Sequence, residues 1–198
     1  MPDPETADTA LPTGADVDVV DLLLTQHARI EEQFLLVIGA AGQARQQAFD
    51  DLVRLLAVHE TAEEEVVHPL SRTIADGAEG IVDDRLQEER QAKEMVTALI
   101  DADVASAGFE TSLLLLRNAV LTHARHEERY EFPQLRAKVP ADRLRGLADV
   151  VRAAEAAAPT RPHPGVESAT ANLVAGPALA AADRARDMVR EAARRAGS

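Results

Sequence analysis

Two stretches of the chain, HETAEEEVVHP (residues 59–69) and HARHEERYEFP (residues 123–133), follow the same pattern. Each begins with a histidine, reaches two glutamates after three residues, and ends with a proline after four more. Residues four apart on an α-helix lie on the same face, about one turn from each other. Because apolar residues continue this face in both directions, the pattern predicts two helices that each turn a histidine and a glutamate towards the protein interior.

Four amphipathic runs with apolar residues at helical spacing occupy residues 15–137. Their connections are short and lie at Gly39 to Gly42, at ADGAEG (75–80) and near Gly108. Helices joined by short loops pack as antiparallel neighbours, so the sequence predicts an all-α, up-down-up-down four-helix bundle with additional C-terminal helices. The predicted organisation is a flexible acidic tail (1–14), the bundle with a di-metal site (15–137), an accessory helix (138–158), a proline-rich linker (159–176) and a C-terminal helix (177–198).

The composition excludes several classes of function. A net charge of −13 and a pI of about 4.8 argue against nucleic acids and anionic membranes as partners. The chain has no cysteine, which excludes disulfides, thiolate metal sites and thiol nucleophiles. It has no apolar run near the roughly 20 residues that span a bilayer, and its acidic start does not resemble a secretory signal. A soluble, cytoplasmic protein is therefore expected.

The inward histidines and glutamates need a common partner, because burying an unpaired carboxylate is costly. A pair of divalent or trivalent metal ions would neutralise the carboxylates and accept the imidazole lone pairs. The first and third helices each add one residue at the corresponding position of the bundle interior. A set of imidazole and carboxylate ligands without sulfur favours iron or manganese over a structural zinc site. The predicted metal ligands are His27, His59, Glu63, Glu89, His123 and Glu127.

Other interpretations of the polar residues remain open. Buried His–Glu pairs also hydrogen-bond without a metal, and stretches such as EER around Glu89 often form solvated helix faces. His126 and Tyr130 are predicted to contact the ligands, Tyr130 from the bundle interior, where its hydroxyl would reach a carboxylate or a bound oxygen species. His68 lies about 180° round an α-helix from the ligand histidine before it, so it is predicted to face away from the metals. Three further glutamates are predicted either to be solvated or to hold ligand histidines by hydrogen bonds: Glu31, Glu64 and Glu128.

Three motifs, QHARIEEQF around His27 and the two repeated stretches, resemble the haemerythrin-like (HHE) cation-binding domain family. The resemblance covers about residues 15–137. It implies a four-helix bundle with a non-haem di-iron centre, bridged by carboxylates and by an oxygen species, that reacts with dioxygen, peroxide or nitric oxide. By this resemblance Glu63 and Glu127 are the expected bridging carboxylates.

The chain departs from the family at one ligand. Many members carry a histidine on the third helix, where RLQEERQAKEMV has none and Glu89 takes its place. A carboxylate in place of an imidazole favours the harder ferric state, which argues against reversible dioxygen carriage. The expected cofactor is two iron ions with an oxo or hydroxo bridge, manganese or zinc being possible substitutes.

Three hypotheses about function follow from these ligands. The first is redox chemistry with a small oxidant, above all peroxide breakdown or iron oxidation. The second is a non-catalytic sensor or sequestration protein for oxygen, nitric oxide or iron. The third is a structural bundle whose metal only supports folding. The sequence does not decide whether the protein is an enzyme, and the small oxidant is the partner it predicts.

Overall fold

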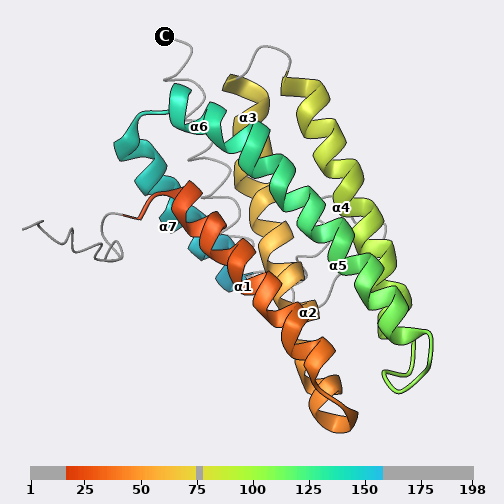
Figure 1. The fold of residues 1–198 in the computed structure, drawn as a ribbon. Helices are drawn as coiled ribbons and strands as arrows, with labels where there is room; N and C mark the ends of the chain where they lie inside the picture. Colours follow the sequence, from red (N-terminus) through yellow and green to blue (C-terminus); the bar gives the residue numbers. More distant parts are fainter. Residues whose placement is uncertain (1–16, 75–77, 158–198) are drawn as a thin grey trace, which may run out of the picture.

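The computed structural model describes residues 17–74 and 78–157, and every regular element within these two ranges is helical (Figure 1). Helix α1 (Val19–Gly39) begins with a capping box, in which Asp18 accepts a hydrogen bond from the backbone N–H of Asp21 and Asp21 accepts one in return. Helix α2 (Gly42–Ala62) follows after two residues. Its first residue has a φ of +57°, a conformation that favours glycine.

Four long helical rods pack side by side as an antiparallel bundle, which confirms the predicted all-α fold (Figure 1). Two of the rods contain a short π-helical turn between two α-helices. The rods are α1, then α2 with η1 (Glu63–Val67) and α3 (His68–Ile74), then α4 (Ala78–Ile100), and finally α5 (Phe109–His126) with η2 (Glu127–Glu131) and α6 (Phe132–Lys138). The third rod begins inside the ADGAEG stretch that the sequence predicts as a loop, and it ends well before Gly108.

The two π-helical turns occupy equivalent places, each starting at the glutamate of a His-x-x-x-Glu motif. The backbone N–H of His68 donates to the carbonyl of Glu63, and that of Phe132 donates to the carbonyl of Glu127. These bonds join residues five apart instead of four, so each turn accommodates one extra residue. Everything that follows is therefore rotated relative to an uninterrupted α-helix, which changes the residues that face the interior.

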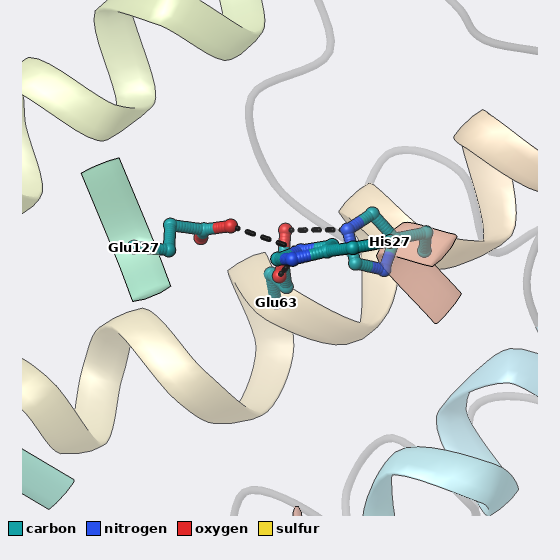
Figure 2. Close-up of side chains that lie close together, drawn as sticks. His27, Glu63 and Glu127 are labelled. Atoms are coloured by element: carbon teal, nitrogen blue, oxygen red, sulfur yellow. Dashed lines mark ion pairs between the residues drawn. The ribbon is translucent and has the colours of Figure 1, made fainter. Parts of the chain in front are cut away.

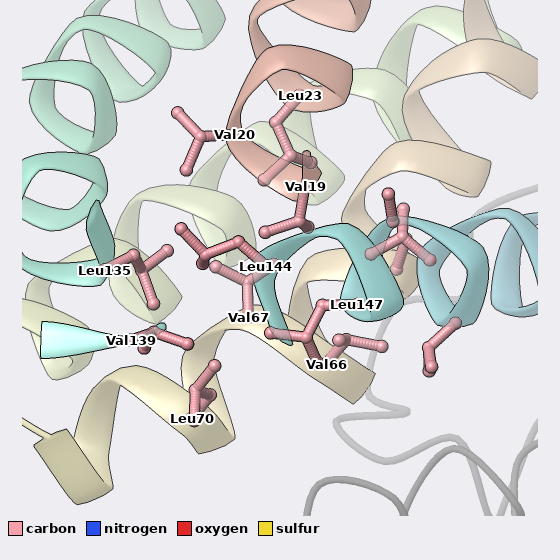
Figure 3. Close-up of a cluster of buried hydrophobic side chains, with 14 of the residues drawn as sticks. Val19, Val20, Leu23, Val66, Val67, Leu70, Leu135, Val139, Leu144 and Leu147 are labelled. Carbon is pink, nitrogen blue, oxygen red and sulfur yellow. The ribbon is translucent and has the colours of Figure 1, made fainter. Parts of the chain in front are cut away.

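A fifth helix, α7 (Ala141–Ala157), occupies the segment predicted as an accessory helix. It packs alongside α1 and α2 (Figures 1 and 3). There Leu144 and Leu147 join a buried apolar cluster with Val66 and Leu70. The predicted N-terminal tail, proline-rich linker and C-terminal helix lie outside the described residues. Within the described part of the chain, no helix has the length and apolar character needed to cross a membrane.

The polar layer of the bundle lies between two apolar clusters. One cluster includes Leu23 of α1 and the residues around α7, and the other begins on α1 with Ile30. In the second cluster Phe49 and Phe109 meet edge to face, with ring centroids 5.2 Å apart. His27 is placed on α1 between Leu23 and Ile30. The interior therefore changes from apolar to ionisable and back along each rod, which isolates the ionisable groups from water.

Candidate metal centre

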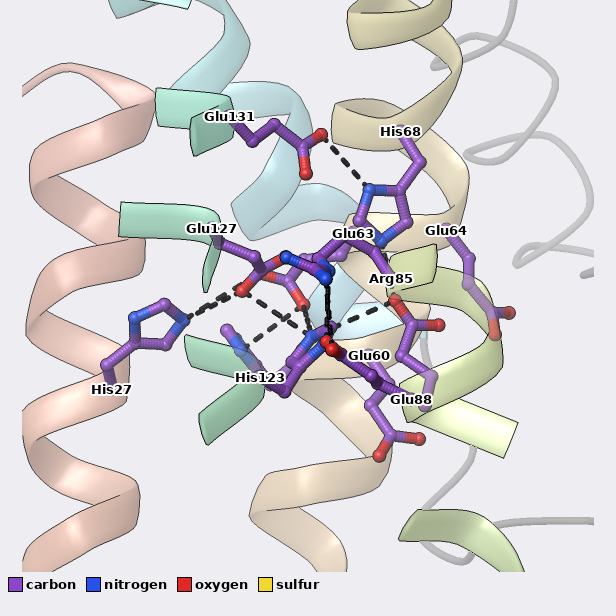
Figure 4. Close-up of polar contacts among 12 residues, drawn as sticks. His27, Glu60, Glu63, Glu64, His68, Arg85, Glu88, His123, Glu127 and Glu131 are labelled. Atoms are coloured by element: carbon purple, nitrogen blue, oxygen red, sulfur yellow. Dashed lines mark hydrogen bonds and ion pairs between the residues drawn. The ribbon is translucent and has the colours of Figure 1, made fainter. Parts of the chain in front are cut away.

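The six predicted ligands come together inside the bundle, and each is at most 8% exposed. Figure 4 labels His27, Glu63, His123 and Glu127 among them. His27 lies on α1, and its Nε2 atom is 3.3 Å from Oε2 of Glu127 and 3.8 Å from Oε1 of Glu63 (Figure 2). Nε2 of His59 is 3.3 Å from Oε2 of Glu63, one helical turn further along the same rod. Nε2 of His123 lies 3.5 Å from Oε2 of Glu127 in the matching motif. The two copies of the repeated motif thus direct their histidine and glutamate side chains towards one centre.

Potential ligand atoms gather in three overlapping groups, within each of which they lie no more than 4.8 Å apart. Glu63 belongs to the first and second groups, and Glu127 to the first and third. A carboxylate that belongs to two groups has the position that a bridge between two metal ions would require. The groups are His27, His59, Glu63 and Glu127; Glu63, Glu89 and His123; and His68, Glu127 and Glu131.

The three predicted ligand histidines are held from behind in the same way. In each ring Nδ1 donates a hydrogen bond to a carboxylate or amide oxygen, while Nε2 faces the centre of the cluster. A partner on Nδ1 fixes the tautomer and the ring orientation that a metal ligand needs. The pairs are His27 with Glu128 (2.8 Å), His59 with Gln26 (2.8 Å) and His123 with Glu88 (3.1 Å).

Buried atoms that face the centre lack hydrogen bonds in the described structure. They include Nε2 of His27 and His123 and both carboxylate oxygens of Glu63 and Glu127. A buried polar atom without a partner costs about 1–3 kcal/mol, and more when it is charged. A bound cation would satisfy all of these atoms at once, so the donor set fits a metal pair.

The ionisation of these residues shows how tightly they interact. Burial lowers the pKa of His27, but the carboxylates of Glu127 and Glu63 outweigh burial and raise it to about 10. Burial lowers the pKa of His59 to about 4, although Glu63 opposes this effect. Burial and the neighbouring Glu63 raise the pKa of Glu127 to about 7. Without a cation, the cluster therefore holds a proton that metal binding must displace.

The prediction that His68 faces away from the centre is wrong. His68 is 2% exposed, and its Nε2 lies 2.5 Å from Oε1 of Glu89. Its Nδ1 lies 3.1 Å from Oε1 of Glu131, a residue to which no sequence pattern pointed (Figure 4). The extra residue in η1 cancels much of the half-turn that an α-helix would place between His59 and His68. The one available signal was that the same spacing to proline follows both motifs.

Tyr130 is also placed differently from its prediction. It is 46% exposed and lies on the outside of η2, where Arg129 packs over its ring. Because η2 adds a residue after Glu127, the interior positions pass to Glu131 and Phe132. Phe132 stacks on the ring of His27, with centroids 5.7 Å apart. No described contact joins Tyr130 to a predicted ligand.

His126 and the three additional glutamates have mixed outcomes. His126 shares Glu88 with His123, at 2.8 Å from its own Nδ1, so it contacts a ligand's partner. Glu128 holds His27, as one of the predicted alternatives proposed. Glu31 pairs with Arg117 and Glu64 pairs with Lys93. Nothing in the sequence pattern pointed to Gln26 or Glu88 as the partners of His59 and His123.

A small cavity of about 20 Å³ adjoins the centre on the side away from α7. This volume accommodates about one molecule of the size of water. Besides the predicted ligand Glu89, the acidic residue that lines this cavity is Glu60. Burial raises the pKa of Glu60 to about 8, although the positively charged Lys93 lies 3.7 Å away and opposes this shift. The wall is mostly apolar and is formed by His27, Ile30, Leu56, His59, Glu60, Glu89, Ala92, Val120, Leu121, His123 and Ala124.

The sequence over residues 18–135 matches the family model described as "Hemerythrin HHE cation binding domain". The chain belongs to this family. Its match covers the rods that carry all six predicted ligands, and it ends before α7. A comparison with curated proteins gave no significant match.

A solved structure shares the fold of this HHE domain. It is the crystal structure of a hemerythrin HHE cation binding domain-containing protein from Mycobacterium kansasii, which is 19% identical, with a TM-score of 0.64. The alignment covers 85% of this chain and 99% of that one. At this level of identity the likeness extends to the arrangement of helices, and the geometry of the site is that of the present chain.

The outer hydrogen bonds of the HHE site lead to a first prediction. Replacing Glu128 by alanine removes the acceptor for Nδ1 of His27, so the ring loses its fixed orientation. We expect the affinity for divalent metal to fall by roughly 10–100-fold, measured by competition with a chromophoric chelator. Glu31→Ala is the matched control, since it removes an exposed carboxylate from a pair with Arg117 that touches no ligand. Equal affinities in the two variants would contradict the positioning role.

Proposed function

We propose that this domain binds two iron ions and that the iron pair breaks down hydrogen peroxide. The observation that carries the proposal is that imidazole Nε2 atoms and shared carboxylates converge beside a cavity large enough for one small molecule. Nitrogen and oxygen ligands without sulfur suit iron, and the carboxylate Glu89 in place of an imidazole favours its ferric state. A bound iron pair supplies a Lewis acid and a reversible source of electrons.

The residues of the chain hold the metals and limit what reaches them. Glu63 and Glu127 lie between the histidines of the two motifs, so both carboxylates would help to hold the two ions. The apolar clusters on either side keep bulk water away from the centre. The cavity volume of about 20 Å³ restricts the ligand to a small molecule such as peroxide or dioxygen.

Peroxide breakdown needs no additional reductant. One hydrogen peroxide is reduced to two water molecules while another is oxidised to dioxygen, so electrons and atoms balance within the pair of substrates. Protons must move between the two peroxides during this exchange. Glu60, which lines the cavity and is linked to the partly buried Glu64 by Lys93, would pass them.

The second prediction tests this reaction directly. Protein loaded with Fe(II) without oxygen is expected to evolve one dioxygen for every two peroxides consumed, over many turnovers, as measured with an oxygen electrode. Protein loaded with Zn²⁺ is the control, because zinc fills the same ligands and has no redox chemistry.

Two results would count against peroxide breakdown. Iron-loaded protein that changes its absorption spectrum once with peroxide but evolves no dioxygen would favour a sensor or a sequestration protein. Protein that binds no iron when Fe(II) is supplied would contradict the iron assignment itself.

A further inference from the structure

His68 shares its burial and the hydrogen bond on its Nδ1 atom with the three predicted ligand histidines. Its ring is buried, and Nδ1 is held by a carboxylate oxygen of Glu131 at 3.1 Å. Its Nε2 faces the centre, 2.5 Å from Oε1 of Glu89 (Figure 4). His126 lacks these features: its side chain is 36% exposed, and it belongs to none of the three groups of potential ligands.

The surroundings of His68 are built from carboxylates that have unused oxygens. Oε2 of Glu89 and Oε2 of Glu131 are buried and have no hydrogen bond in the described structure. Glu127, which also approaches His27 and His123, offers an oxygen within 4.8 Å of His68 and Glu131. A plain ion pair between His68 and two carboxylates would leave these oxygens without partners.

We propose that His68 is a ligand of the second metal ion, in the cluster of Glu89, His123 and the shared carboxylates, and that Glu131 positions its ring. The proposal rests on the metal pair of the proposed function. The first ion would be held by His27 and His59 of the first group. The second would take His123 from α5 and His68 from α3, because α4 contributes only Glu89. The π-helical turn η1 thus supplies from the second rod the imidazole that the third rod lacks.

The chemistry of the second ion would differ from that of an ion held by Glu89 and His123 alone. An added imidazole is a softer ligand than a carboxylate, so it stabilises Fe(II) relative to Fe(III) and helps the ion to change oxidation state during turnover. Glu131 would act on Nδ1 as Glu128 acts on His27 and Glu88 on His123. Each of the four imidazoles would then have one nitrogen for the protein and one for the metal.

The test is an anaerobic Fe(II) titration of the full chain, in the wild type and in His68→Ala. We expect the wild type to bind about two ions per chain and His68→Ala to bind one of them more than roughly 100-fold more weakly, since loss of a mere outer partner already costs about 10–100-fold. Added imidazole, which fits the space left by the ring, is expected to restore the second ion. His126→Ala is the matched control and should keep both ions.

Glu131→Gln separates the positioning role of Glu131 from direct ligation. The glutamine oxygen still accepts the Nδ1–H of His68, so both ions should remain, bound about 10-fold more weakly or less. A wild type with three ions that loses one in this variant would place a third cation on His68 and Glu131, and would overturn the proposal.

Wild-type affinity for both ions in His68→Ala, with an unchanged absorption spectrum after air oxidation, would also overturn it. Circular dichroism of the metal-free variant distinguishes loss of a ligand from loss of the fold, and rescue by imidazole does so independently. Failure of the wild type to bind iron at all would instead reject the proposed function.

Discussion

The double variant His59→Ala/His123→Ala is expected to contain almost no iron after loading, against about two ions per chain in the wild type. Each substitution removes one imidazole from one half of the centre, and the remaining groups around each ion become mainly carboxylate. His59 and His123 approach Glu63 and Glu127 respectively at 3.3 and 3.5 Å, so each variant position loses an imidazole that faces a shared carboxylate. Elemental analysis of the desalted protein measures the result.

The control for this variant is His126→Ala, which also removes an imidazole from α5. Its ring contacts Glu88 and Tyr130 but belongs to no group of potential ligands. Circular dichroism should show the same helix content in both variants. A double variant that keeps its full iron content would rule out the ligand assignment for the repeated motif.

Removal of the metals is expected to lower the melting temperature by a large amount. The metal-free centre leaves several buried atoms of Glu63 and Glu127 without hydrogen bonds, and burial together with Glu63 raises the pKa of Glu127 to about 7. A ligand present at 1,000 times its Kd stabilises the folded state by about 4 kcal/mol. For a chain of this size that corresponds to a fall of roughly 8–16 °C for each site emptied.

Calorimetry of the iron-loaded protein before and after chelation measures this effect. The same chelator should not change the melting temperature of His59→Ala/His123→Ala, which has no metal to lose. A wild type that melts at the same temperature in both states would mean that the buried polar groups of the centre satisfy one another by hydrogen bonds without a metal. Such a result would favour hydrogen-bonded His–Glu pairs over a metal site.

Much of the fold follows from the spacing of residues. The apolar stripe through Leu23, His27 and Ile30 marks the interior face of α1, and the structure buries all three side chains. The accessory helix agrees with its prediction because its amphipathic pattern is uninterrupted and begins after a proline. The inward direction of the two repeated motifs follows from the four-residue spacing alone, since both lie in regular α-helix up to their glutamates.

Where the regular α-helical periodicity ends, counting residues no longer predicts which way a side chain points. His68 and Tyr130 both follow a glutamate of the repeated motif, and both were assigned by counting residues along an α-helix. The π-helical turns change that count by one, so His68 moves inwards and Tyr130 outwards. Partners such as Gln26 and Glu88 come from neighbouring helices, and their identity depends on how the rods pack. No periodicity within one rod encodes such a contact.

The π-helical turns make the composition of the site depend on the backbone hydrogen-bond pattern as well as on residue identity. If the stretch from Glu63 to Val67 formed α-helical hydrogen bonds with no residue deleted, His68 would swing by about 100° away from Glu89. The ligand motif before the turn would be untouched. A relative that keeps every histidine and glutamate but continues here as an uninterrupted α-helix would therefore build a differently composed centre.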